Sequence, residues 1–127
     1  MPRANEKRIW ISMSDQLEEG HYIRIEVTYT GSPASVLVFR YQGKCLAYRN
    51  LCVHMPRELD CEKDTIFDDT GQFLRCSMHG IVYDPITGES MSTMCTGERL
   101  TPVRVLEDED GIWIQDKQVK NIMTRKE

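Results

Sequence analysis

The sequence predicts an all-β fold built from short antiparallel strands. Apolar and polar residues alternate with a period of two over several segments, as in strands that bury one face. Turn sequences that contain glycine separate these segments, and only residues 14–20 have the composition of a helical turn. A chain of 127 residues has the length of one domain. We therefore expect a single domain over residues 1–127.

The expected strands are joined by tight turns. Residues 21–29 alternate as a half-buried strand should. Gly-containing turns then predict four hairpins. The first joins residues 36–41 to 44–48, and the second, around Asp68–Gly71, leads into residues 73–75 and Cys76. The third lies at Thr87-Gly88, and the fourth, at Asp110-Gly111, joins residues 103–106 to 112–115. Trp10 and Trp113 are interpreted as core residues. The polar, basic segment 117–127 is expected to be a frayed tail.

The net charge of −4 is unevenly distributed. Residues 60–69 and 107–110 are acidic, whereas both ends of the chain are basic. We interpret these runs as solvated surface, and docking to a charged protein partner is the alternative. No basic face carries interleaved aromatic residues, so the sequence predicts no nucleic-acid binding.

The cysteines and the N-terminus predict a cytoplasmic protein. The apolar stretch at residues 9–11 is too short for the core of a signal peptide, and no apolar run approaches the roughly 20 residues of a membrane-spanning helix. Cys45, Cys61 and Cys95 are odd in number and scattered, which argues against a disulfide framework. Cys45 is predicted to be a small buried residue on a strand.

Two short motifs pair a cysteine with a histidine, Cys52-Val53-His54 and Cys76-Ser77-Met78-His79, and Gly80 follows the second. Two cysteines and two histidines are the ligands of a Rieske cluster, in which each pair holds one iron. Gly80 suits a tight turn after His79. A zinc site is the alternative, although zinc fingers usually group like ligands together.

Residues 51–54 (LCVH) and 76–88 (CSMHGIVYDPITG) resemble the two boxes of the small bacterial Rieske ferredoxins, and residues 95–103 resemble the stretch that follows. The resemblance covers residues 9–114. It implies a Rieske-type antiparallel β-sandwich with a cluster-binding subdomain at one tip, formed by loops at about 50–60 and 75–85. It also implies one [2Fe-2S] cluster per chain, with Cys52 and Cys76 on one iron and His54 and His79 on the other.

The resemblance also suggests a sub-class. Where quinol-oxidising Rieske proteins carry a disulfide between the boxes, this chain has Arg57 and Met78, so no such brace forms. The high-potential members have a serine after the Gly of the second box, where this chain has Ile81, but the tyrosine further on is kept as Tyr83. We expect the Tyr83 hydroxyl to reach the Cys52 sulfur. The expected potential lies in the lower half of the roughly −150 to +300 mV Rieske range.

The function implied is that of a one-electron carrier between a reductase and a terminal acceptor such as a Rieske non-haem iron oxygenase. Catalysis is not expected, because an oxygenase needs a further iron held by two histidines and a carboxylate. Beyond the two motifs, only His21 remains, and it is predicted to be a surface residue. Two alternatives stay open, a Rieske-like small subunit of a larger oxidoreductase such as nitrite reductase, and a zinc-stabilised or redox-sensing interaction domain.

Overall fold

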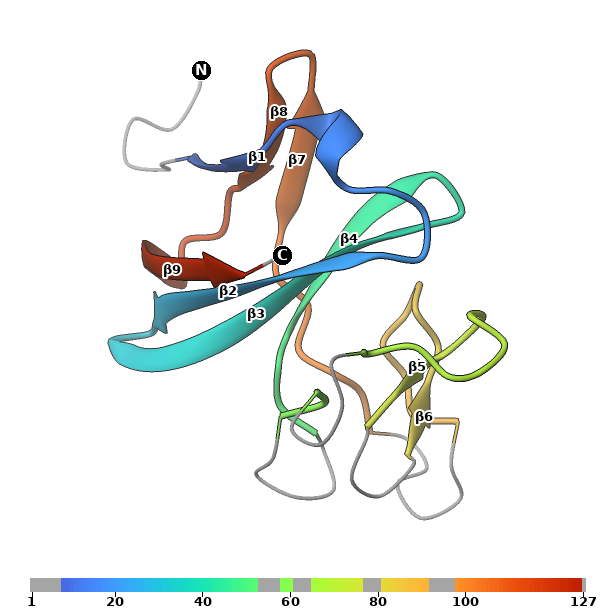
Figure 1. Ribbon diagram of the computed structural model, residues 1–127. Coiled ribbons are helices and arrows are strands. Elements are labelled where there is room, and N and C mark those ends of the chain that lie inside the picture. The colour runs from blue at the N-terminus through green and yellow to red at the C-terminus, as the bar shows by residue number, and fades with distance from the viewer. Residues whose placement is uncertain (1–7, 53–57, 61–64, 77–80, 92–97, 127) are drawn as a thin grey trace.

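The computed structural model describes residues 8–52, 58–60, 65–76, 81–91 and 98–126, which form three antiparallel sheets (Figure 1). The sheets have the strand orders β1-β8-β7, β4-β3-β2-β9 and β5-β6. In these ranges the only helical segment is one 3-10 turn, η1 (Ser14–Gln16). The predicted all-β fold is therefore confirmed. The strands are β1 (Ile9–Ser12), β2 (Tyr22–Tyr29), β3 (Ser32–Tyr41), β4 (Lys44–Arg49), β5 (Leu74–Arg75), β6 (Val82–Tyr83), β7 (Val105–Asp108), β8 (Gly111–Ile114) and β9 (Val119–Lys126).

Two tight hairpins build the central sheet. Gln42 and Gly43 join β3 to β4, as predicted, and both have positive φ, 52° and 79°. Thr30 and Gly31 join β2 to β3 with φ of 48° and 90°. Positive φ at both central residues is the geometry of a type I′ turn, whose twist matches the strands. The sequence analysis missed this second hairpin, because threonine rarely adopts positive φ.

The central sheet is covered on both faces, and this decides where the site lies. β3 is buried without interruption from Ser35 to Phe39. Successive side chains of a strand point to opposite faces, so Val36 and Val38 enter one core while Leu37 and Phe39 enter another. In Figure 1 the β1-β8-β7 sheet lies above the central sheet, and β5-β6 lies below it.

We call the two groups of buried residues the sandwich core and the site core. The sandwich core, between the two larger sheets, contains Ile11, Leu17, Ile23, Ile25, Val27, Tyr29, Val36, Val38, Ala47, Val103, Ile112, Ile114 and Val119. The site core, on the other face of the central sheet, contains Leu37, Phe39, Tyr48, Cys52, Leu59, Ile66, Leu74, Cys76, Ile81, Tyr83 and Leu100.

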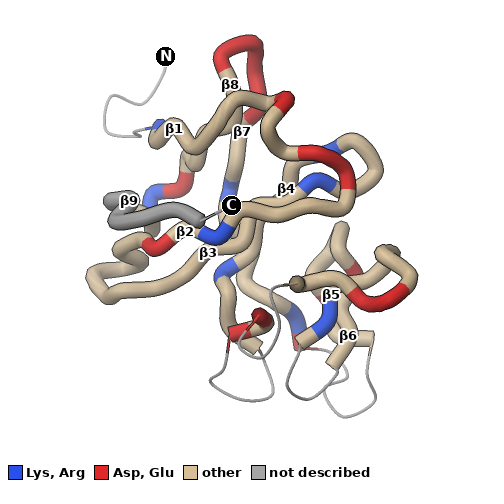
Figure 2. The backbone as a smooth tube through the Cα atoms, viewed as in Figure 1, with Lys and Arg blue, Asp and Glu red and all other residues tan. Residues whose placement is uncertain are grey.

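The remaining predicted turns are confirmed. The Asp68 amide donates to the Phe73 carbonyl at 2.9 Å, which closes the turn that leads into β5 and Cys76. Gly88 has φ of 77° in the turn after β6, where Tyr83 bridges to Ser90. β7 and β8 pair on either side of the acidic turn, which stands out at the top of Figure 2.

The expectation of a frayed tail over residues 117–127 was wrong. Val119–Lys126 forms β9, which pairs antiparallel with β2. Without β9, the outer edge of β2 would carry unpaired backbone donors and acceptors. Backbone hydrogen bonds do not depend on side-chain polarity, so the polar composition of this segment was a poor guide. Val119, only 5% exposed, adds its side chain to the sandwich core.

The expectation of a buried Trp10 was also wrong, since Trp10 is 41% exposed and Trp113 is half-buried. The two face each other across β1 and β8. Trp10 Nε1 donates to the Asp110 carbonyl and Trp113 Nε1 to Asp108 Oδ1, each at 3.0 Å. Because Ile112 and Ile114 point into the sandwich core, Trp113 covers the outer face of its sheet.

His21 is exposed just before β2, as predicted. No helix within the described ranges has both the length and the apolar character needed to cross a membrane.

Candidate metal centre

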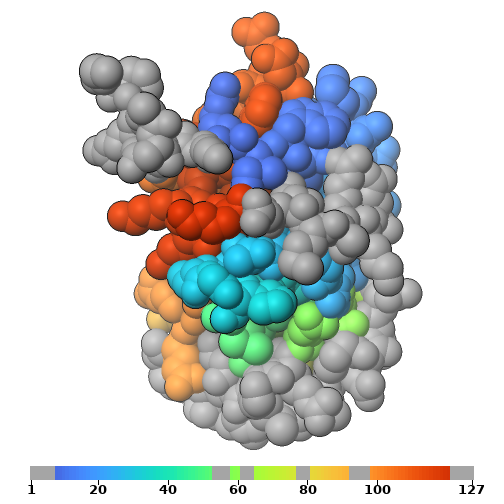
Figure 3. All heavy atoms as spheres, turned by 90° about the vertical axis from the view of Figure 1, so that its left-hand side faces the viewer, coloured from blue at the N-terminus to red at the C-terminus, as the bar shows by residue number. Residues whose placement is uncertain are grey.

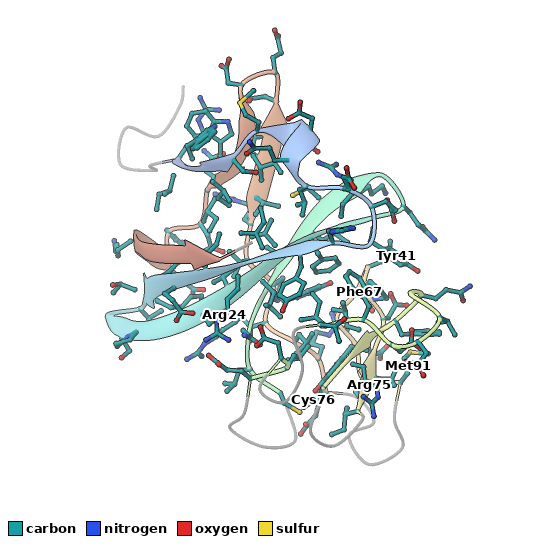
Figure 4. All side chains as sticks on the ribbon, viewed as in Figure 1. Arg24, Tyr41, Phe67, Arg75, Cys76 and Met91 are labelled. Carbon is teal, nitrogen blue, oxygen red and sulfur yellow. The ribbon has the colours of Figure 1, made fainter. Side chains whose placement is uncertain are left out.

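Cys52 and Cys76 lie at the starts of two loops and are buried in the same site core. Cys52 follows β4 after two residues, and Cys76 directly follows β5. Cys52 is 3% exposed and Cys76 is fully buried, and both are free thiols. The structure thus brings together the two cysteines that the sequence motifs single out (Cys76 is labelled in Figure 4).

The histidine half of the predicted ligand set lies outside the described residues. His54, His79 and Gly80 fall in segments 53–57 and 77–80, so their roles stay predictions. Accordingly, no group of three Cys, His, Asp or Glu residues forms a metal site within the described part of the chain. Two buried thiols that are not joined in a disulfide fit the thiolate half of an iron–sulfur site.

Backbone pairing closes the second loop. Leu74 pairs with Tyr83 and Arg75 with Val82 in the β5-β6 ladder. The Cys76 amide donates to the Ile81 carbonyl at 2.9 Å, which adds a rung next to the loop. The two ends of the segment that carries His79 are therefore fixed by main-chain hydrogen bonds.

The Tyr83 hydroxyl lies 3.2 Å from the Cys52 sulfur, as the sequence analysis expected. Tyr83 is fully buried in the site core, and its position on β6 places it beside the first loop. A hydroxyl that donates to a ligating sulfur favours the more negative reduced state and raises the potential. Ile81, at the serine position, is buried and offers no side-chain donor. That Tyr83 tunes a cluster remains a prediction.

Replacing Tyr83 by Phe should lower the midpoint potential. If the hydrogen bond is worth about 1 kcal/mol more in the reduced state, the fall is about 40 mV, since a tenfold change corresponds to about 59 mV for one electron. An EPR-monitored redox titration measures it.

Tyr48→Phe is a matched control, because Tyr48 is buried in the same core but donates to the Pro85 carbonyl at 2.9 Å. Burial, helped by the charge of Asp84, raises the pKa of Tyr48 to about 12, so this hydroxyl keeps its proton. We expect Tyr48→Phe to leave the potential within about 10 mV. Equal potentials for Tyr83→Phe and the unsubstituted protein, with the cluster intact, would remove Tyr83 from the site.

Cys45 lies apart from this centre. It is on β4, half-buried, and packs against the sandwich core on the other face of the central sheet. Burial raises the pKa of its thiol to about 12, and the negative charge of Glu107 acts in the same direction. Cys45 therefore lies on a strand and packs against a core, as predicted, but it is half-buried and not buried. Cys61 and Cys95 lie outside the described residues.

Sequence reasoning missed the polar side chains that flank the first loop. Asn50 is 3% exposed, and the Asp60 carboxylate is 5% exposed, although the acidic segment 60–69 was interpreted as solvated surface. That interpretation was wrong for Asp60. The available signal was position alone, since Asn50 stands two residues before Cys52.

The fold and the buried thiol pair define a class, that of β-sandwich proteins with two cysteines buried in a second core beside the sandwich. The particular family is the Rieske [2Fe-2S] domain, whose family model matches residues 7–118. The chain belongs to this family, which binds a Rieske-type [2Fe-2S] cluster.

Solved structures show the same fold. The ferredoxin of carbazole 1,9a-dioxygenase from Nocardioides aromaticivorans IC177 is 23% identical, with a TM-score of 0.65 over 87% of this chain and 98% of that one. A chain from a complex of reduced oxygenase and oxidized ferredoxin in carbazole 1,9a-dioxygenase is 23% identical, with a TM-score of 0.68 over 92% of this chain and 99% of that one. No curated protein matches the chain.

A third similarity is to a longer chain. The fluorene-bound oxygenase and ferredoxin complex of carbazole 1,9a-dioxygenase contains a chain that is 18% identical, with a TM-score of 0.69, over 87% of this chain and 29% of that one. The fold is therefore similar both to whole chains of about this length and to one part of a larger chain.

Proposed function

We propose that this protein is a Rieske-type ferredoxin, which carries single electrons from a reductase to a terminal acceptor such as a Rieske non-haem iron oxygenase. The observation that carries the proposal is the pair of free, buried thiols, Cys52 and Cys76, in one core of a Rieske-family chain. The similarity to a ferredoxin over 98% of that protein's length supports a stand-alone carrier. Structures of oxygenase and ferredoxin complexes support an oxygenase as the partner class.

The proposed ligands are divided between the two irons of the cluster. Cys52 and Cys76 would hold one iron, and His54 and His79 the other. The bound cluster supplies one-electron redox chemistry. The site core, with Leu59, Ile66 and Leu74 fully or almost fully buried, keeps water from the thiol side. A low-dielectric surrounding strengthens the hydrogen bond from Tyr83 to the Cys52 sulfur.

We assign no catalytic residue. With His54 and His79 used as ligands, His21 is the remaining histidine of the sequence, and it is exposed at the start of β2. One histidine is too few for the two-histidine iron site of an oxygenase. We place the protein in the cytoplasm, where thiols stay reduced, and the free thiols of Cys45, Cys52 and Cys76 support this.

The test is a redox titration of the purified protein followed by visible absorption and EPR. We expect a coloured protein that takes up one electron per chain, with a midpoint potential in the lower half of the roughly −150 to +300 mV Rieske range. A colourless protein that contains zinc would overturn the proposal in favour of a zinc-stabilised interaction domain. Co-purification with a large catalytic subunit would show instead that this protein is a subunit of a larger oxidoreductase.

A further inference from the structure

One buried amide joins the two ends of the first ligand loop. Asn50 Oδ1 accepts from the Leu59 amide at 2.8 Å, and Asn50 Nδ2 donates to Asp60 Oδ1 at 3.0 Å. The same Nδ2 lies 3.2 Å from Ser35 Oγ, and the Asn50 amide donates to the Ser35 carbonyl at 2.7 Å. Asn50 therefore links the two ends of the segment that contains Cys52 and His54, and it also links this segment to β3.

The Asp60 carboxylate is 5% exposed and accepts hydrogen bonds from three side chains. Besides Asn50, it accepts from Arg24 Nη1 at 2.9 Å and from the Tyr22 hydroxyl at 3.1 Å. A buried carboxylate is costly unless it is paired and hydrogen-bonded. These three donors come from β2 and from the residue after β4, so Asp60 is held by the central sheet from two directions.

Arg24 supplies the positive charge. It lies on the face of β2 opposite to Ile23 and Ile25, and in Figure 4 it points from the central sheet toward the loops below. Its Nε donates to Glu26 at 2.6 Å and its Nη2 to Glu58 at 2.9 Å. Burial works against the charge of Arg24, but the hydrogen bonds to Glu26 and Glu58 and the charge of Asp60 outweigh it and raise the pKa of the guanidinium.

The two ligand loops are closed by different means. The second is closed by the β5-β6 ladder, that is, by backbone. The first has no such ladder among the described residues, and the sequence offers no disulfide brace between positions 57 and 78. Its two ends are linked by Arg24, Asn50 and Asp60, which we call the loop neck. In Figure 3 the green segments near residues 50 and 58–60 lie directly below the cyan strands of the central sheet.

We propose that the loop neck consists of positioning residues, which hold together the two ends of the segment that contains Cys52 and His54. This inference rests on the proposed function, because it gives Cys52 and His54 their role as ligands. It predicts that breaking the loop neck releases iron without unfolding the sandwich core. A purely structural ion pair would lower stability and leave the centre unchanged.

The experiment compares the holoprotein with Asp60→Ala, which leaves Arg24 and Asn50 without their shared acceptor. We expect iron to pass to a chelator about tenfold faster, since hydrogen bonds to charged groups are worth about a factor of ten or more. We also expect altered EPR g values, because the first loop is held less firmly. Asp60→Asn, which keeps an acceptor oxygen, should restore part of the slow release.

Glu107→Ala is the matched control. Glu107 forms a two-point ion pair with Arg40, at 2.6 and 3.0 Å, and this pair links β3 to β7 on the side of the sandwich core. We expect a lower melting temperature, unchanged g values, and a release rate within about twofold of the unsubstituted protein. If Asp60→Ala fails to fold, Tyr22→Phe removes one donor to Asp60 and should speed release about threefold.

The three variants are compared at temperatures equally far below their melting points. The proposal is overturned if Asp60→Ala and Tyr22→Phe release iron no faster than Glu107→Ala and their g values are unchanged. A failure of the proposed function looks different, because the unsubstituted protein would then lack the cluster spectrum. In that case hydrogen exchange of the Leu59 amide is compared. Faster exchange in Asp60→Ala than in Glu107→Ala supports the loop neck, and equal exchange overturns it.

Discussion

Replacing Cys76 by Ala should abolish the visible and EPR spectra completely. Cys76 is fully buried in the site core and directly follows β5, and Cys45, the remaining thiol of the described residues, lies on the other face of the central sheet. Binding of a metal group is coupled to the ordering of the loops that hold it, so the loops lose stability as well. We expect the same result for Cys52→Ala, His54→Ala and His79→Ala, measured by absorption, EPR and iron content.

Cys45→Ser is the control for thiol loss. Cys45 packs on the opposite face of the central sheet, against the sandwich core, so the substituted protein should keep its full spectrum. Ser at positions 61 and 95 is also expected to leave the spectrum in place. A coloured, EPR-active Cys76→Ala protein would contradict the ligand assignment.

Replacing Gly111 by Ala should destabilise the sandwich strongly. Gly111 begins β8 with φ of 133°, which residues with a side chain rarely adopt. A Cβ there would clash with the Ser12 carbonyl oxygen and lie 2.7 Å from Trp10 Nε1. Backbone strain and overpacking together cost about 3 kcal/mol of unfolding free energy. Thermal unfolding should show a melting temperature lower by roughly 10 °C.

Gly43→Ala separates backbone strain from overpacking. Gly43 also has positive φ, 79°, but a Cβ there would meet nothing within 4 Å. We expect a loss of about 1 kcal/mol, which is the cost of a left-handed residue alone. Equal losses for the two substitutions would show that β1 moves aside freely. Both proteins should keep the cluster spectrum at 25 °C, because both glycines lie outside the site core.

Local patterns predicted most of the fold. Alternation and Gly-containing turns identified β2, β3, β4, β7 and β8, since these features act between neighbouring residues. They failed for β9, because its pairing is with β2, ninety or more residues away, and is made by backbone groups that carry no sequence signal. Trp10 was misplaced because its apolar ring lies on the outer face of a sheet, where its Nε1 also finds an acceptor.

Some residues of the candidate site were predicted from the sequence, and others were not. The cysteines were found because ligand chemistry restricts residue type and spacing together. The contact between Tyr83 and Cys52 was expected from family resemblance. The loop neck was not found, because an acidic segment usually faces solvent and nothing local shows that Arg24, on a distant strand, meets Asp60. Burial of a charge depends on tertiary structure.

The division between sandwich core and site core has a consequence for how the protein is made. No buried residue belongs to both groups as described, and β3 alternates between them. The sandwich core can therefore fold as one cooperative unit before any metal arrives. A newly synthesised chain would then receive its cluster on a finished scaffold. Metal loss, by the same reasoning, leaves a molecule that can be refilled.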